Sequence, residues 1–402
     1  MPFDPQAATA AYIDSLGAGA LAKAAAYTAG NHWLLLWGLV VSGIFTWVIV
    51  RWGVLDRIAA RLARRGVNLR TFVVAATFFA LSSLLTLPWE LYADWWRESR
   101  YGRTSQPLAD YLGQQAIGIV IFALLVGLFF VGVYALIRRA GPRWWLWSGG
   151  LTAAALAAFL LAAPVFIEPI FNEFEPVPEG EVRDALVGMA QRAGVPADRI
   201  FVYDGSRQSN NFTANVSGVG GSARIAISDV AFKGASLDEV KAVTGHEIGH
   251  YVLHHVWRTV AVFSALAILF FFLADRLFPR FARAFGSSAT LADPAGLPVL
   301  LFMLSLFAVL AEPVSNTLSR IDETESDRYS LETVELPDAL ASALVKTAEY
   351  RNPRPHPVQE MLFYTHPSVE RRVRMAMEWK AAHSAADLQD PVPATPPHAV
   401  LY

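Results

Sequence analysis

Cysteine is absent from this 402-residue chain, and charged residues are scarce. Without cysteine the chain forms no disulfide, offers no thiolate to a metal ion and has no cysteine nucleophile. Only 17% of its residues are charged and the formal net charge is −2, so nothing favours a nucleic-acid partner. The first residues also lack the basic segment, short apolar core and cleavage site of a secretory signal.

Hydrophobic residues, by contrast, make up 54% of the chain and gather in long runs. Four runs are long enough, or nearly so, to cross a membrane as helices, and two shorter ones can extend into flanking helical segments. The six runs are 32–50, 71–91, 116–137, 146–167, 259–274 and 297–311. Tryptophan and tyrosine crowd their ends, as in an interfacial aromatic belt. We therefore predict a mostly α, multi-pass membrane protein with about six spans. The Ala-rich segment 7–28 is expected to be an interfacial or lumen-lining helix and not a further span.

The main polar region lies between the fourth and fifth runs, at about 168–257. A helical pattern over 181–193 ends at Gly194, and segments 199–204 and 224–228 are typical of strands. Ser236 and Glu239 have the spacing of a capping box, which opens another helix. The simplest assembly is a small α+β region inserted into a helical membrane bundle.

That last helix carries His246-Glu247-Ile248-Gly249-His250. Histidines four apart share one helical face and can ligate one zinc ion, while the intervening glutamate is offset toward the open coordination position. This is the layout of a metallopeptidase site, although an isolated match is equally well explained by a helix with two polar faces. His254 and His255 follow on the same predicted helix, where a polar helix end meeting the membrane accounts for both as well as a function does.

Two histidines and a water leave zinc one protein ligand short, and without cysteine that ligand must be His, Asp or Glu. Glu323 and Asp327 follow the sixth run and share one helical face. One can ligate the metal while the other accepts a hydrogen bond from a ligand histidine. A hairpin of the fifth and sixth spans would bring the helix with Glu323 and Asp327 back beside the helix that carries His246 and His250. Charge pattern alone would favour a solvated acidic face.

Motifs in the same order resemble the integral-membrane, zinc-dependent CAAX prenyl proteases of type I, which are gluzincin metallopeptidases. The resemblance covers most of the chain and is carried by segments 97–102, 108–110, 166–172, 202–207, 244–251, 319–327 and 365–372. It implies that one Zn²⁺ is held by His246, His250 and Glu323 and that Glu247 is the general base.

By the same resemblance Asp327 is the hydrogen-bond partner of a ligand. His366 and Arg372 would stabilise the oxyanion or orient the site, although a loop histidine at a helix N-terminus also explains His366. The expected substrate strand is the segment Thr213, Ala214, Asn215, Val216, Ser217 and Gly218. A peptide would add to it as an extra strand, with the backbone N–H of either Asn215 or Ser217 facing the peptide. Here the chain departs from the family's usual Asn-Ala-Tyr run, and the family's first membrane helix is missing.

The predicted division is a four-span membrane domain at 1–167, a catalytic region at 168–257, a membrane hairpin at 258–312, catalytic helices at 313–389 and a disordered tail at 390–402. The expected partners are membrane lipid and peptide or protein substrates, with or without a prenyl group. A quality-control protease without lipid specificity is an alternative, as is a transporter or scaffold with a structural metal. Oligomeric state stays open. So does the membrane face, because the positive-inside rule places the catalytic region outside the cytoplasm whereas the resemblance favours the cytosol.

Overall fold

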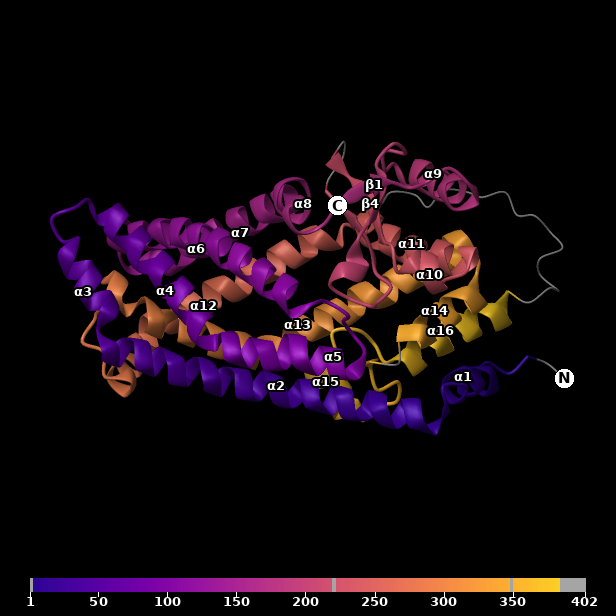
Figure 1. Cartoon of the computed structure of the whole chain (residues 1–402), viewed down its shortest axis with the longest axis horizontal. Coiled ribbons are helices and arrows are strands. Elements are labelled where there is room, and N and C mark those ends of the chain that lie inside the picture. Colours follow the sequence, from indigo (N-terminus) through magenta and orange to yellow (C-terminus); the bar gives the residue numbers. More distant parts are fainter. Residues whose placement is uncertain (1–2, 219–221, 348–349, 384–402) are drawn as a thin grey trace.

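The computed structural model describes residues 3–218, 222–347 and 350–383, and most of them are helical (Figure 1). Within these residues six helices are long and apolar enough to cross a membrane: Gly17–Trp52, Val67–Tyr101, Leu108–Arg139, Gly141–Phe171, His255–Phe285 and Pro294–Val334. This confirms the predicted multi-pass, mostly α bundle. The predicted tail at 390–402 lies outside the described residues.

Helix α1 (Pro5–Asp14) and helix α2 (Gly17–Trp52) share the Ala-rich segment 7–28, which forms no span of its own. At 1.5 Å per residue α2 is about 54 Å long, well beyond a hydrocarbon core of about 30 Å. Its first turns therefore reach the end of the molecule that holds the sheet (Figure 1). There the Thr28 hydroxyl oxygen accepts a 2.8 Å hydrogen bond from the Asn352 backbone N–H.

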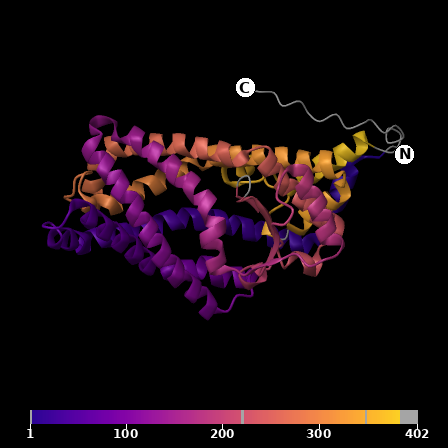
Figure 2. The same cartoon turned by 90° about the horizontal axis from the view of Figure 1, so that it is seen from above.

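The other bundle helices before the sheet are α3 (Val54–Arg61), α4 (Val67–Glu90), α5 (Arg97–Tyr101), α6 (Leu108–Arg139), α7 (Trp144–Ala162) and α8 (Glu168–Phe171). Short π-helical segments, η1 (Leu91–Trp96) and η3 (Ala163–Ile167), continue α4 and α7. A core of buried side chains that includes Ile49, Phe78, Tyr134, Phe278 and Leu300 fills the bundle. Figures 1 and 2 show the bundle at one end of an elongated molecule and the sheet with its helices at the other.

The sheet has the order β1 (Phe174–Pro176), β2 (Ile200–Tyr203), β4 (Arg224–Ser228), β3 (Ala214–Ser217). Strands β2 and β4 are parallel, and the other two pairs are antiparallel. The two strands expected at 199–204 and 224–228 are present as β2 and β4. Strand β1 was not predicted, because its Pro-punctuated sequence shows no alternation. Strand β3 falls within the predicted substrate segment and occupies an edge of the described sheet.

Three helices pack with the sheet region: α9 (Glu181–Ala193), α10 (Ala231–Gly234) and α11 (Leu237–Val252). Gly194 ends α9 with φ 69°, as expected. The capping box is also formed, since Ser236 and Glu239 exchange backbone-to-side-chain hydrogen bonds of 2.7 and 3.2 Å. The prediction that α11 continues through His254 and His255 is wrong. It ends at Val252, His254 adopts φ 58°, and a new helix begins at His255.

The new helix is α12 (His255–Phe285), which pairs with α13 (Leu297–Val334). Helix α13 is the most enclosed candidate span: half of its apolar window is buried, against 6–22% in the other five. Helices α14 (Pro337–Thr347), α15 (Pro357–Phe363) and α16 (Val369–Ala382) follow. The five-part division stays a prediction, and its boundaries at 257/258 and 312/313 fall inside α12 and α13.

Candidate active site

Glycines let α11 lie directly against α13. A Cβ on Gly249 would come within 3.0 Å of the Ser326 Cα, and one on Gly245 within 2.5 Å of a Val334 methyl group. Only residues without a side chain allow two helix backbones this close. The approach sets the histidines of α11 opposite the acidic residues of α13.

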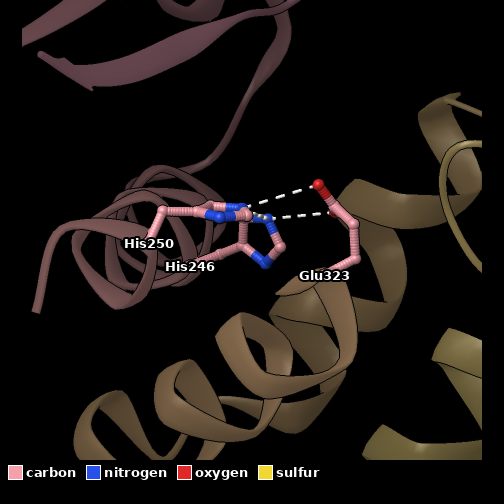
Figure 3. A group of neighbouring side chains, drawn as sticks. All are labelled: His246, His250 and Glu323. Carbon is pink, nitrogen blue, oxygen red and sulfur yellow. Dashed lines mark hydrogen bonds and ion pairs between the residues drawn. The ribbon is translucent and has the colours of Figure 1, made fainter. Parts of the chain in front are cut away.

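Three side chains converge at this contact, with His246 and His250 pointing from α11 toward Glu323 on α13 (Figure 3). The two Nε2 atoms are 3.2 Å apart, and they lie 3.3 Å (His246) and 3.5 Å (His250) from the Glu323 carboxylate oxygens. Ligands 2.0–2.1 Å from a tetrahedral zinc ion stand about 3.3 Å from one another. The spacing therefore suits a single small cation.

The hydrogen bonds around these side chains also suit a bound cation. The Nδ1 atom of His246 lies 2.8 Å from an Asp327 oxygen, so it carries the proton and leaves a lone pair on Nε2. That lone pair faces Glu323 Oε2, a buried atom that receives no hydrogen bond from the described residues. Apart from the Arg372 guanidinium, 3.4 Å from Oε2, nothing in the described residues satisfies these two acceptors, and a cation between them would satisfy both. Two imidazoles and one carboxylate form a donor set that zinc accepts.

Asp327 is in turn held by Arg372 of α16. The guanidinium donates two 2.6 Å hydrogen bonds, one to each carboxylate oxygen. Asp327 is fully buried and Arg372 nearly so. A planar guanidinium that grips both oxygens fixes the orientation of the carboxylate, and through it that of the His246 ring.

His250 is supported differently. Its Nδ1 lies 2.9 Å from Nδ1 of His255, whose Nε2 lies 3.0 Å from a Glu325 oxygen. If Nε2 of His250 is a ligand, its Nδ1–H donates to His255, and Nε2–H of His255 donates to Glu325. The sequence left His255 undecided and gave no role to Glu325.

His255, Asp322 and Glu325 also bring metal-ligating atoms within 4.8 Å of one another. Arg258 forms ion pairs with both of these carboxylates, at 2.7 Å to Glu325. Because the Arg258 guanidinium already pairs with both carboxylates, we assign no second metal to this cluster.

Two further predicted residues lie at the site. Burial raises the pKa of the Glu247 carboxyl, against the opposing effect of His246 and His250. Nε2 of His366 lies 3.2 Å from a Glu323 oxygen. Burial, reinforced by the charge of Arg351, lowers the pKa of His366 to about 3, so its ring is neutral at pH 7.

The predicted substrate strand borders the same site. Ser228 donates its backbone N–H to the carbonyl of Thr213, and alternation from that pair turns the N–H groups of Asn215 and Ser217 toward β4. The expectation that one of these two groups faces a peptide is therefore wrong, since positions two apart point the same way. The N–H groups of Ala214 and Val216 point to the open edge instead.

A cavity of about 650 Å³ begins at this edge. It is lined by 216–218 of β3 and its end, by His250 and His255, and by apolar side chains of α7, α12 and α13. The candidate metal centre thus opens toward an apolar space between the sheet and the membrane helices.

Comparisons with known proteins place this site in a family. The model of peptidase family M48 matches residues 176–380. A second model, described as the CAAX prenyl protease N-terminal region with five membrane helices, matches residues 6–173, where the structure has four of its six candidate spans.

Relatives and solved structures agree. The chain is 28% identical over 362 residues to a Bacillus subtilis protein named uncharacterized metalloprotease YhfN, covering 88% of this chain and 83% of the relative. It is 27% identical over 363 residues to CAAX prenyl protease 1 of Saccharomyces cerevisiae, covering 84% and 76%. The crystal structure of S. mikatae Ste24p has the same fold, with a TM-score of 0.73, 21% identity and 90% of each chain covered. This chain therefore belongs to peptidase family M48 and is a multi-pass membrane metallopeptidase.

Proposed function

We propose that the protein is a zinc metalloendopeptidase that cuts extended peptides of membrane-associated proteins. The observation that carries the proposal is the convergence of His246, His250 and Glu323 at tetrahedral spacing. Structural zinc sites are usually closed by four protein ligands, whereas three ligands leave a position for catalysis. This argues against a scaffold with a structural metal.

In this proposal the zinc site, Glu247 and His366 each have a separate role in peptide hydrolysis. A zinc ion held by these three residues supplies Lewis-acid activation of a water molecule and of the peptide carbonyl. Glu247 takes the proton of the attacking water and delivers it to the leaving amine; its raised pKa suits both steps. Neutral His366 has an N–H with which to stabilise the developing oxyanion.

Strand addition accounts for how a peptide is held. The outward N–H groups of Ala214 and Val216 can pair with an extended backbone, which fixes its direction past the metal ligands. Val216→Pro removes one of these donors and should abolish cleavage while zinc content is unchanged, whereas Val216→Ala keeps the donor and should retain activity. Equal cleavage by both variants would exclude pairing at this edge.

The substrate class we propose is lipid-bearing or membrane-associated peptides of the CAAX type. Relatives are named CAAX prenyl proteases, and the 650 Å³ cavity has apolar walls that include Leu160, Val260 and Phe263. A quality-control protease without lipid specificity is the second candidate. Paired peptides with and without a prenyl group separate the two, because only the first candidate requires faster cleavage of the prenylated peptide.

The mechanism is tested by Glu247→Gln. This variant should keep about one zinc per chain, since it alters no ligand, and should lose peptide cleavage. Asp238→Asn removes an exposed carboxylate from the same helix and should behave as the parent. Full cleavage by Glu247→Gln would overturn the proposal.

A further inference from the structure

A second cavity, of about 450 Å³, adjoins the candidate active site. It lies among residues 27–35 of α2, the middle of α13 and the segment 350–366. Asn316 and Thr365 line both this cavity and the 650 Å³ cavity, and His366 lines this one while contacting Glu323. A peptide that passes the metal ligands therefore has room to continue into it.

Arg351 lines this second cavity. Its side chain makes no hydrogen bond or ion pair with any described residue, and its Cζ lies 5.9 Å from the centroid of the Tyr350 ring. Two other arginines are paired: Arg372 with Asp327, and Arg320 with two backbone carbonyls at 2.6 and 3.0 Å. Arg103, stacked on the same Tyr350 ring at 3.5 Å, has a buried nitrogen without a hydrogen-bond partner among the described residues, but it does not line the cavity.

The guanidinium of Arg351 is half-buried beside this cavity. Partial burial lowers the pKa of Arg351, yet arginine stays charged in proteins, so a charged guanidinium faces the cavity without a hydrogen-bonded anion among the described residues. Glu312 lines the same cavity but forms no ion pair with Arg351. The free donors are arranged as a fork that matches a carboxylate.

We propose that Arg351 binds a carboxylate of the substrate and so sets the distance from that carboxylate to the bond that is cut. This inference rests on the proposed peptidase function. Two sources share the chemistry, namely the C-terminal carboxylate and an Asp or Glu side chain near the C-terminus. In either case Arg351 is a specificity residue and takes no part in bond cleavage.

Matched peptides test the assignment. One extended peptide is made with the ending Ala-Val-Leu as the free acid, the same ending as the amide, and Ala-Asp-Leu as the amide. The parent protein should cleave the free acid or the Asp-containing amide with kcat/KM roughly ten- to a hundredfold above the plain amide. Whichever of the two is preferred identifies the source of the carboxylate.

Variants then locate the effect. In Arg351→Leu the ratio of acid to plain amide should fall to about one, and Arg351→Lys should keep part of it because it keeps the charge. Arg354→Leu removes a nearby arginine that is paired with Asp14 and Glu370, and it should keep the parent ratio. A parent ratio near one, or an unchanged ratio in Arg351→Leu, would overturn the inference. If Arg351→Leu does not fold, the acid-to-amide ratios of the parent and of Arg351→Lys decide whether the inference holds.

A binding readout separates this inference from the proposed function. The tripeptides Ala-Val-Leu (acid and amide) and Ala-Asp-Leu amide are compared by the thermal stabilisation they give the zinc-loaded parent and Arg351→Leu. Stronger stabilisation by a carboxylate, lost in the variant, supports the assignment even if no peptide is cleaved. Equal stabilisation by all three overturns it while leaving the zinc chemistry untouched.

Discussion

The two histidines of the candidate metal centre present the same Nε2 atom to Glu323, yet their surroundings differ. His246 is backed directly by Asp327, a fully buried carboxylate that Arg372 holds through both oxygens. This half of the site is buried, and hydrogen bonds fix the orientation of its ring and carboxylate.

His250 is backed by another imidazole, and the carboxylate comes only after it. The Glu325 and Arg258 side chains that end this chain are 38% and 35% exposed. His250 and His255 also line the 650 Å³ cavity. The comparison indicates that one half of the site anchors the metal to the protein and the other half faces the substrate. We therefore expect substitutions on the His246 side to have the larger effects on metal affinity and stability.

The largest effect should follow removal of a ligand. His246→Ala, His250→Ala and Glu323→Ala should each lose most of the bound zinc, because two remaining protein ligands hold it poorly. Metal analysis of the purified variants measures this. His254→Ala, which removes an exposed histidine outside the cluster, should keep about one zinc per chain; a ligand variant that did so too would exclude that residue from the site.

The second-largest effect on zinc binding should be that of Asp327→Asn. It should weaken zinc affinity roughly ten- to a hundredfold, because the ligand histidine loses its carboxylate partner. It should also destabilise the fold, by up to about 3–5 kcal/mol, because buried Arg372 loses the carboxylate that accepts its two hydrogen bonds and keeps only Glu323, at 3.4 Å, as an ion-pair partner.

Zinc titration and denaturant unfolding measure the two effects separately. Adding Arg372→Met to Asp327→Asn should recover stability but not zinc affinity. Unchanged zinc affinity in Asp327→Asn would contradict the claim that the His246 side of the site anchors the metal. Asp338→Asn, at an exposed carboxylate, is the control.

His255→Leu should weaken zinc affinity less, by about tenfold, the lower end for an outer partner of a ligand. His255→Asn should restore much of the loss, because its amide oxygen can accept the proton of His250 Nδ1. Titration of both variants tests the direction of that hydrogen bond. Equal losses in the two would show that His255 acts by packing alone.

Glu325→Gln should have the smallest effect, because the group is partly exposed and exposed ion pairs contribute about 0–1 kcal/mol. Zinc affinity should change less than fivefold by the same titration. An effect as large as that of Asp327→Asn would remove the distinction between the two halves.

Much of the fold and of the candidate site follows from local sequence patterns. The apolar runs predict the six spans, and the capping box and Gly194 mark helix ends. The four-residue spacings place His246 with His250, and Glu323 with Asp327, on common helical faces. Each of these depends on residues within a few turns of one another, which is the range that sequence patterns report.

Features that depend on tertiary packing were not predictable. The helix break at His254 lies between two helix-forming segments and turns His255 back onto His250. Arg351 reaches the site only because the start of α2 and the segment before α15 meet there. The register of β3 follows from its pairing with β4, which no alternation within the strand reveals.

The account's central claim is an open site with three protein ligands, and X-ray absorption at the zinc edge tests it most directly. The zinc-loaded protein should show two imidazole nitrogens at about 2.0–2.1 Å and one carboxylate, with a light non-protein atom as the fourth neighbour. Glu247→Gln should give the same spectrum. A fourth protein ligand, or a spectrum unchanged by His250→Ala, would contradict the account.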